Sequence, residues 1–360
     1  MRDGGSETTT LRLQQPEQNA VTEPLQQYQL LPQDPLEPVY EDAGSSGVAG
    51  SERPLKERGL PRPVSFRWES AGRESSDLMY ELLLSKDPAF GGSIRRSSSG
   101  NEVSVANLEI GTRYYWRVVA QDGSRPVAQS PVRSFCTDPT PPRWVHVPGL
   151  TNLRDLGGWP VSATLRIRQG LIYRCCELNV SRKVAEEGVA ALRELGIRTD
   201  LDLRAGGQPA LDESEARWVS APVEPYGNIV VSEFVPGYKR AFDTFSDPAR
   251  YPILLHCAGG VDRTGTVAFL LEALLGLELS SLLQDYELTS LSTVAPRSHT
   301  CEGFQRLLSE LAKFGEPSDP PRAKVERYLL SIGIMPTQMQ TIRGLLLEPI
   351  GPPASTPSPA

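Results

Sequence analysis

The stretch from Tyr251 to Gly276, YPILLHCAGGVDRTGTVAFLLEALLG, decides how the second half of this 360-residue chain folds. Its first residues are mostly apolar, which is typical of a buried strand. The apolar residues after Thr264 recur at three- and four-residue spacing, and this predicts a helix that begins near Arg263. Cys257 is therefore expected between the carboxyl end of a strand and the amino terminus of a helix, where open α/β sheets bind ligands.

This loop has the chemistry of an anion-binding site. The unpaired N–H groups and the positive dipole at a helix amino terminus favour a negative charge. Three loop residues carry little or no side chain, so successive N–H groups can turn toward phosphate oxygens: Ala258, Gly259 and Gly260. Arg263 adds a guanidinium fork for the same anion. The same field stabilises a thiolate on Cys257, and the hydroxyl of Thr264 can donate a hydrogen bond to the sulfur.

The residues from His256 to Gly265, HCAGGVDRTG, resemble the signature loop of the cysteine-dependent protein tyrosine phosphatases. Within that superfamily the loop is most similar to a bacterial and fungal branch that reads His-Cys-x-x-Gly-x-Asp-Arg-Thr-Gly. Four further segments resemble this branch in the same order: NLRDLGG at 152–158, LIYRCCEL at 171–178, IRTDLDLR at 197–204 and QDYELT at 284–289. The resemblance implies a tyrosine phosphatase-like α/β domain over residues 139–350, with a largely parallel central sheet flanked by helices.

The resemblance also implies a reaction that needs neither a metal nor a cofactor. Cys257 would attack phosphorus and form a cysteinyl-phosphate, while Arg263 and the loop N–H groups would hold the equatorial oxygens. Asp262 would be the general acid for the leaving oxygen. The sequence contains no Trp-Pro-Asp to supply the mobile acid loop of the larger tyrosine phosphatases, so Glu224 and Asp243 are kept as alternative acids.

The expected substrate contacts come from two segments. Those in the loop are Ala258, Gly259, Gly260, Val261 and Thr264. Those in the segment 152–158, which either line the pocket or brace it, are Asn152, Arg154 and Asp155. A third segment supplies Asp202 and Arg204, which either face the same cleft or form a buried salt bridge.

The residue beside the expected acid bears on the substrate class. Val261 stands where several members of the branch have a lysine, and a multiply phosphorylated headgroup benefits from additional cations. Phosphotyrosine in a phosphorylated protein is therefore the favoured substrate, and a phosphoinositide or a dual-specificity substrate is the alternative. A noncatalytic phospho-ligand binder is a second alternative, because a pseudophosphatase would keep the cradle. A rhodanese or an arsenate reductase is disfavoured, because the four supporting segments resemble the phosphatase branch.

Strand and helix patterns surround the loop. The stretch 184–196 predicts an amphipathic helix that ends at Gly196, and further helical patterns follow at 279–290, 302–314 and 324–333. Strands that alternate with helices indicate a largely parallel sheet covered on both faces.

The first half of the chain has short β-rich runs separated by turn residues, between residues 61 and 138. On the fourth run, Tyr114 and every second residue after it are expected on one face. The segment from Leu108 to Ala120, LEIGTRYYWRVVA, resembles the part of a fibronectin type III domain that holds a corner tyrosine, here Tyr114. Trp68 falls where that family places an early core tryptophan. The resemblance implies an all-β sandwich, which we expect to dock or space a protein partner.

The chain ends and the composition complete the expectation. Residues 1–60 and 351–360 are predicted to be disordered tails. A net charge of -7 and a pI of about 5.3 argue against nucleic-acid binding. The 5 cysteines are too few and too irregular for a disulfide framework or a paired zinc motif. The sequence shows neither an apolar leader nor a run long enough for a transmembrane segment, so a cytoplasmic protein is expected.

Overall fold

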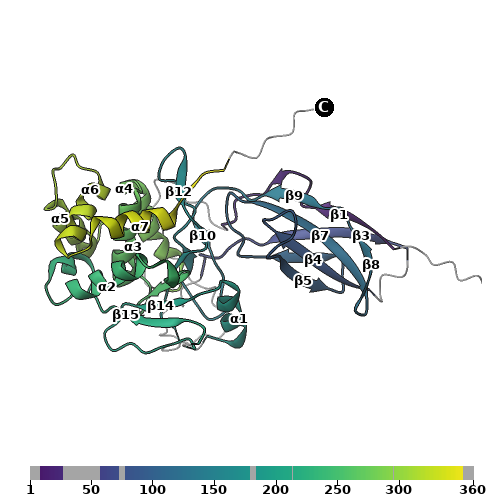
Figure 1. Ribbon diagram of the computed structural model, residues 1–360, viewed down its shortest axis with the longest axis horizontal. Helices are drawn as coiled ribbons and strands as arrows, with labels where there is room; N and C mark the ends of the chain where they lie inside the picture. The colour runs from purple at the N-terminus through teal and green to yellow at the C-terminus, as the bar shows by residue number, and fades with distance from the viewer. Residues whose placement is uncertain are drawn as a thin grey trace, which may run out of the picture. The chain divides into compact units, whose positions relative to one another are not determined.

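The computed structural model describes residues 9–26, 57–72, 78–178, 184–212, 214–294 and 296–351. The chain divides into two compact units, whose elements are labelled in Figure 1. Of the described residues, the first unit contains 9–25, 61–141 and Gly351, and the second contains 26, 57–60 and 142–350. The remaining parts of the two predicted tails, at 1–8, 27–56 and 352–360, lie outside the described residues.

The first unit is built from two β-sheets. The three-stranded sheet has the order β1-β3-β6, with β1 Thr10–Gln15, β3 Val64–Ala71 and β6 Glu102–Val105. The second sheet has the order β2-β9-β7-β4-β5, with β8 paired to β7. Its strands are β2 Ala20–Val21, β4 Met79–Ser85, β5 Ile94–Ser98, β7 Arg113–Asp122, β8 Arg125–Gln129 and β9 Arg133–Cys136.

The core of this unit draws on alternate residues of its strands. On β7, Tyr114, Trp116, Val118 and Ala120 are buried, which confirms the predicted alternation. The rings of Phe66 on β3 and Trp116 on β7 meet edge to face with centroids 5.1 Å apart. Residues of both sheets therefore share one core.

The two residues behind the predicted fibronectin resemblance both have structural partners. The backbone N–H of Glu109 donates to the Tyr114 hydroxyl at 3.0 Å, which closes a corner ahead of β7. Trp68 is buried on β3, opposite Leu13 of β1. Membership of the fibronectin type III family stays a prediction.

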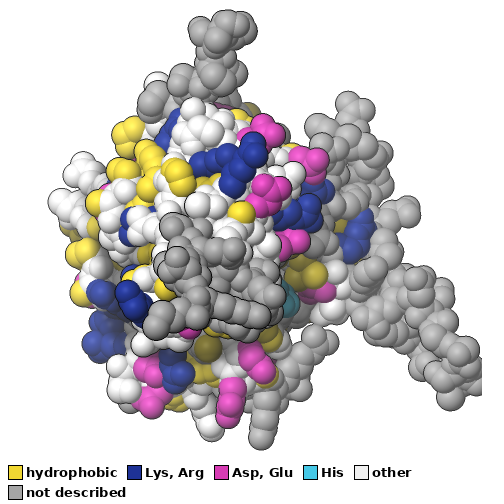
Figure 2. Space-filling view, turned by 90° about the vertical axis from the view of Figure 1, so that its right-hand side faces the viewer, with side chains coloured by type: hydrophobic (Ala, Val, Ile, Leu, Met, Phe, Trp, Pro, Cys, Tyr) yellow, Lys and Arg dark blue, Asp and Glu magenta, His cyan; other side chains and the backbone are white. Residues whose placement is uncertain are grey.

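Charged side chains of both signs are interspersed on the face drawn in Figure 2. Some of the ion pairs of the first unit join neighbouring strands, as between Arg67 Nε and Glu102 Oε1 at 3.0 Å. Mixed signs without a dominant charge are typical of a solvated protein surface.

The prediction of a disordered tail over residues 1–60 is wrong for two stretches. β1 pairs antiparallel with β3, and Leu11 and Leu13 are buried in the core of the first unit. Residues 57–60 lie on the second unit, where the N–H of Arg58 donates to the Leu291 carbonyl at 2.6 Å. The polar composition of the whole stretch concealed a short strand, TLRLQQ, whose two leucines alternate with polar residues.

The second unit is an α/β domain around a six-stranded mixed sheet with the order β10-β11-β13-β16-β14-β15. Its strands are β10 Arg143–Trp144, β11 Arg154–Asp155, β13 Ile172–Cys175, β14 Thr199–Asp202, β15 Arg217–Ser220 and β16 Ile253–His256. The four neighbouring strands β13, β16, β14 and β15 run parallel. In contrast, β10 pairs antiparallel with β11, and β11 pairs antiparallel with β13. A separate antiparallel pair joins β12 Leu165–Ile167 to β17 Leu347–Pro349. The predicted α/β arrangement of sheet and helices is confirmed.

Helices cover both faces of this sheet. Leu254 of β16 packs in one cluster with Leu192 of α1, whereas Ile253 and Leu255 pack in the larger cluster with α3. The first cluster contains α1 Glu186–Glu194, the predicted helix. The larger cluster contains residues of α2 Val235–Phe245, α3 Asp262–Leu275, α4 Leu279–Glu287, α5 Glu302–Ala312, α6 Pro321–Ser331 and α7 Pro336–Leu346. Short 3-10 helices are η2 Tyr226–Val230, η3 Pro248–Arg250 and η4 Leu288–Leu291. The sequence predicts neither α2 nor α7.

We expect Leu13→Ala to destabilise the first unit by about 2–5 kcal/mol, the usual cost of truncating a buried leucine. Leu13 is 3% exposed and lies opposite Trp68. Amide hydrogen exchange, read by mass spectrometry, should become faster along β3 and β7. Arg12→Ala, on the exposed face of the same strand, is the matched control. Equal exchange in the two variants would contradict the position of β1 in this core.

Candidate active site

The loop after β16 is shaped by one glycine. Cys257 follows the last residue of β16, and α3 begins at Asp262. Gly260 has a φ of 70°, in the left-handed region that favours glycine. A Cβ at this position would also collide with the carbonyl oxygen of Cys175 on the neighbouring strand. Backbone conformation and space therefore both require glycine where the chain turns from strand to helix.

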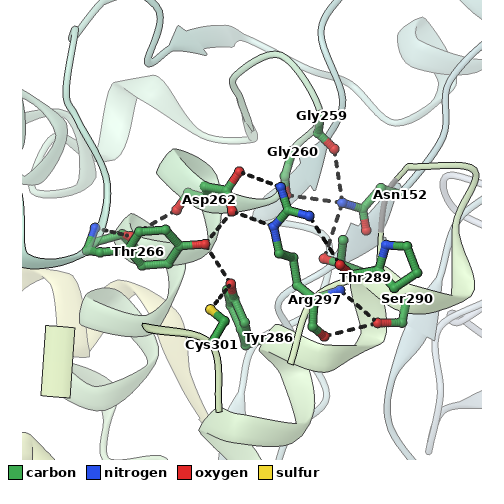
Figure 3. Close-up of polar contacts among 12 residues, drawn as sticks. Asn152, Gly259, Gly260, Asp262, Thr266, Tyr286, Thr289, Ser290, Arg297 and Cys301 are labelled. Atoms are coloured by element: carbon green, nitrogen blue, oxygen red, sulfur yellow. Dashed lines mark hydrogen bonds and ion pairs between the residues drawn. The ribbon is translucent and has the colours of Figure 1, made fainter. Parts of the chain in front are cut away.

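The loop carbonyls are held from behind by two side chains. Asn152 Nδ2 donates to the carbonyls of Gly259 at 3.2 Å and Gly260 at 3.1 Å, and Arg174 Nη2 donates to the Gly260 carbonyl at 2.9 Å. Figure 3 shows the Asn152 amide pointing at both glycines. Asn152 and Arg174 are fully buried, so these carbonyls face the interior. Because N–H and C=O point in opposite directions in a trans peptide, the N–H groups of Gly260 and Val261 point away from Asn152, as an oxyanion cradle requires.

A buried carboxylate on α4, Asp285, orients both of these side chains. Arg154 Nε donates to Asp285 Oδ1 at 2.8 Å, and Arg174 Nη1 donates to Asp285 Oδ2 at 2.6 Å. Arg154 Nη1 in turn donates to Asn152 Oδ1 at 2.6 Å. Burial alone would raise the pKa of Asp285, but the charges of Arg154 and Arg174 outweigh it and lower that pKa. Asp285 therefore stays ionised and fixes the amide and the guanidinium that contact the loop.

This buried network carries an excess of positive charge. Glu272 of α3 is also buried, and its burial, together with the charge of Asp285, holds its pKa well above the usual range and favours its neutral form. Two arginines, Arg154 and Arg174, then face one ionised carboxylate. Arg174 also interacts electrostatically with Cys257, so this positive charge lies close to the loop.

His256 fixes the backbone at Cys257. Its Nε2 lies 2.6 Å from Asp200 Oδ1, and its Nδ1 lies 3.3 Å from the Cys257 carbonyl oxygen. Burial alone would lower the pKa of His256, but the hydrogen bond and the charge of Asp200 outweigh it and raise that pKa. A buried histidine therefore ties Cys257 to β14.

A pocket of about 610 Å³ opens beside the first turn of α3. It is lined by Glu224, Pro225, Tyr226, Asp262, Arg263, Pro296, Arg297, Ser298 and Cys301. Within the described ranges, the Arg263 guanidinium has no hydrogen bond or ion pair. Thr264 Oγ1 is buried and also lacks a hydrogen-bond partner among the described residues. Arg263 therefore retains its donors for an anion in the pocket, and the buried Thr264 hydroxyl retains one donor.

Asp262 borders this pocket and is held by two side chains that sequence reasoning missed. Arg297 Nε donates to Asp262 Oδ1 at 2.9 Å, and Arg297 Nη2 donates to Oδ2 at 3.4 Å (Figure 3). The Tyr226 hydroxyl also donates to Oδ1. Burial raises the pKa of Tyr226, and the Asp262 carboxylate raises it further, so the hydroxyl keeps its proton. Tyr226 begins the short 3-10 helix η2 and Arg297 lies in an irregular segment, and at neither position does a periodic pattern mark a functional residue.

The backbone of Tyr226 is itself fastened to α3. Its φ of 63° is unusual for a residue with a side chain. The Tyr226 N–H donates to Thr266 Oγ1 at 3.0 Å. The Thr266 hydroxyl in turn donates to the Asp262 carbonyl at 2.9 Å (Figure 3). These contacts hold the hydroxyl of Tyr226 beside the carboxylate of Asp262.

The segment 152–158 braces the loop and does not contact the pocket. Asn152 and Arg154 belong to the buried network behind the loop. The predicted substrate contact of Asp155 is wrong. Its buried carboxylate pairs with Arg143 Nη1 at 2.6 Å and accepts the N–H of Gly157 at 2.7 Å. Adjacent strand residues point to opposite faces, so Asp155 faces away from the network that Arg154 joins.

The other candidate residues separate into near and distant ones. Asp202 and Arg204 form the buried salt bridge that was one of their two expected roles, with Nη2 and Oδ2 2.8 Å apart. Of the alternative acids, Glu224 lines the pocket. Asp243 pairs with Lys239 on α2 and lines a different groove, so the structure removes it as an acid for this site.

The fold and the site define an α/β domain that places a cysteine between the end of a parallel strand and the start of a helix. Residues 145–348 match the model of the tyrosine phosphatase family, which is more than half of the chain. The chain belongs to that family.

Individual relatives are more distant. A protein of Cupriavidus necator, provisionally named a tyrosine-protein phosphatase, is 29% identical over 165 residues, which cover 38% of this chain and 59% of the relative. The chain thus spans less than two thirds of that protein. Two structures of the catalytic core of Siw14, one titled as a PP-IP phosphatase from S. cerevisiae in complex with citrate, are each 20% identical with a TM-score of 0.28. They cover 34% and 41% of this chain, and 75% and 80% of their own chains.

Among the described residues, every helix is too short or too polar to span a bilayer. The described residues also contain no group of three His, Cys, Asp or Glu side chains that could hold a metal ion.

We expect Asp285→Asn to lower the free energy of unfolding by about 3–5 kcal/mol at neutral pH, because it leaves two buried guanidinium groups without their counter-charge. The folded-state pKa of Asp285 lies below its usual range. Its contribution is therefore complete above the unfolded pKa of about 3.9 and is lost as the pH falls through the folded value. Urea unfolding measured at neutral pH and in steps below about pH 4 should show the difference between wild type and variant shrink only at the acidic end.

Asp319→Asn is the control, because it removes an exposed ion pair with Arg327 and should leave the urea midpoint nearly unchanged. An Asp285→Asn protein as stable as the wild type would contradict the role given to this carboxylate.

Proposed function

We propose that the second unit hydrolyses phosphomonoesters, with phosphotyrosine in proteins as the substrate class, through a cysteinyl-phosphate on Cys257. One observation carries the proposal. Cys257 stands where β16 ends, the N–H groups of Gly260 and Val261 point away from Asn152, and Arg263 keeps an unpartnered guanidinium among the described residues. Membership of the tyrosine phosphatase family supports the same chemistry.

The reaction would proceed in two displacements. The Cys257 thiolate attacks phosphorus, so that an S–P bond forms and the P–O bond to the leaving group breaks. Protonated Asp262 gives its proton to the leaving oxygen. A water then attacks phosphorus and passes a proton to Asp262, the S–P bond breaks, and inorganic phosphate leaves. Arg263 and the loop N–H groups hold the equatorial oxygens in both steps, and the Thr264 hydroxyl donates to the departing sulfur.

The pocket walls support an aryl phosphate as the substrate. Pro225, Tyr226 and Pro296 offer apolar surface beside Arg263, against which a phenyl ring can pack. Val261 is 5% exposed and adds no charge to the loop, which disfavours a multiply phosphorylated headgroup. A phosphoinositide phosphatase is the competing assignment. The β-sandwich would serve as a docking or spacing module for a protein partner.

Cys257→Ser should abolish hydrolysis of p-nitrophenyl phosphate, because a serine hydroxyl stays protonated at neutral pH and is a much weaker nucleophile than a thiolate. Wild-type activity should persist in EDTA, because the proposed steps use protein groups alone. The release of p-nitrophenol measures both. Equal rates in wild type and Cys257→Ser would reject catalysis and favour the phospho-ligand binder. Faster release of inorganic phosphate from phosphoinositides than from phosphotyrosine peptides would replace phosphotyrosine with phosphoinositides as the substrate class.

Asp262→Asn should slow an aryl phosphate with a poor leaving group more than one with a good leaving group, because only the former needs a proton as its bond breaks. We expect a loss of roughly tenfold or more on phenyl phosphate and a smaller loss on p-nitrophenyl phosphate. Steady-state kinetics across a series of aryl phosphates gives the dependence on the leaving group. Glu224→Gln is the comparison. If Asp262→Asn slows all the aryl phosphates equally while the rate loss in Glu224→Gln grows steeply as the leaving group becomes poorer, the acid role belongs to Glu224.

A further inference from the structure

The side chain expected to be the acid, Asp262, has hydrogen-bond donors on both of its carboxylate oxygens, which leaves no oxygen free to carry a proton. Both carboxylate oxygens of Asp262 accept hydrogen bonds from Arg297, and Oδ1 also accepts one from Tyr226. A guanidinium fork on a carboxylate stabilises the ionised form. To donate a proton, Asp262 must lose at least part of this contact and gain a proton from solvent.

Arg297 is held so that its side chain alone can move. The Arg297 N–H donates to Ser290 Oγ at 3.1 Å, and the Ser290 hydroxyl donates to the Arg297 carbonyl at 3.0 Å. Ser290 is buried, so the backbone of Arg297 is anchored, as Figure 3 shows. The side chain of Arg297 is 34% exposed and borders the pocket. Both side chains of this ion pair are about one-third exposed, so a second carboxylate can reach Arg297 from solvent.

The pocket carries two guanidinium groups, Arg263 at the loop and Arg297 at the rim. Arg263 is accounted for by the phosphate of the substrate under the proposed function. Arg297 is then available to a second anionic group of the same substrate. A carboxylate that binds Arg297 takes the guanidinium away from both Asp262 oxygens, so that Oδ2 is free to carry a proton to the leaving oxygen.

We propose that Arg297 recognises an acidic side chain beside the phosphotyrosine of a peptide substrate, and that this contact releases Asp262 to act as the acid. The proposal rests on the proposed function and names the substrate class more closely: phosphotyrosine flanked by Asp or Glu. Arg297 is thereby a specificity-determining residue, and the binding of a substrate carboxylate to it is coupled to the acid function of Asp262. The apolar walls at Pro225 and Pro296 take the aryl ring, and the rim arginine takes the flanking carboxylate.

Matched phosphotyrosine peptides test the recognition. One peptide carries Glu on both sides of the phosphotyrosine, and the other carries Gln. We expect the wild type to favour the Glu peptide by roughly tenfold or more in kcat/KM, in line with a charge-assisted hydrogen bond. In Arg297→Ala the ratio should fall to about one. Arg297→Lys, which keeps the charge without the fork, should retain part of the preference.

Phenyl phosphate tests the coupling to the acid, because it has a poor leaving group and no second anion. With Arg297 removed, Asp262 is free, so Arg297→Ala should hydrolyse phenyl phosphate roughly tenfold faster than wild type. The gain should vanish in Arg297→Ala combined with Asp262→Asn. A purely structural arginine would give slower turnover in the variant. Arg193→Ala, which removes an exposed pair with Glu215, is the matched control.

The outcomes separate the two proposals. If the wild type cleaves the Glu and Gln peptides with equal kcat/KM, the role of Arg297 is rejected and the proposed function stands. If phenyl phosphate turnover does not rise in Arg297→Ala, the coupling to Asp262 is rejected. If neither peptide is cleaved while p-nitrophenyl phosphate is, the phosphotyrosine assignment falls together with the role of Arg297.

Discussion

The ion pairs of the Asp285 carboxylate with Arg154 and Arg174 are the interaction on which the loop after β16 depends. They hold Arg154 and Arg174 in fixed positions, and these two side chains in turn set the Asn152 amide and the Gly260 carbonyl. A buried ion pair often adds little net stability, because desolvation offsets the attraction. The ion pairs of Asp285 instead fix the positions of the side chains that contact the loop. The N–H groups of Gly260 and Val261 point away from Asn152 because the carbonyls of the same peptides are held on the Asn152 side.

The parts of the site that are local in sequence could be predicted. Strand, glycine turn and helix follow each other within the stretch 251–276, so the position of Cys257 and the start of α3 were accessible from spacing alone. The role of Asn152 and Arg154 could not be predicted from spacing, because it depends on Asp285, which lies far along the chain. Periodicity also says nothing about Arg297, whose place at Asp262 follows from how the chain after η4 packs.

Fold prediction failed where polar composition or proline concealed a regular element. Helices α2 and α7 each carry a proline in the first turn, where the missing N–H costs nothing, yet proline in sequence is more readily taken as a breaker. Strand β1 has two leucines among polar residues, and its burial depends on β3, some fifty positions later. Helices α1 and α3, whose apolar residues recur without interruption, were predicted from their period.

Tyr226 orients the carboxylate of Asp262, the proposed acid, by a contact that does not involve Arg297. Its hydroxyl donates to Asp262 Oδ1 and is also 2.7 Å from the Tyr286 hydroxyl, and burial raises the pKa of both tyrosines. When Arg297 turns to another anion, Tyr226 would still occupy Oδ1, so the proton would be carried on Oδ2. Because Thr266 fixes the backbone of Tyr226 to α3, the orientation of that oxygen would be set by the same helix that begins at the phosphate loop. The nucleophile, the phosphate cradle and the acid would then share one rigid frame.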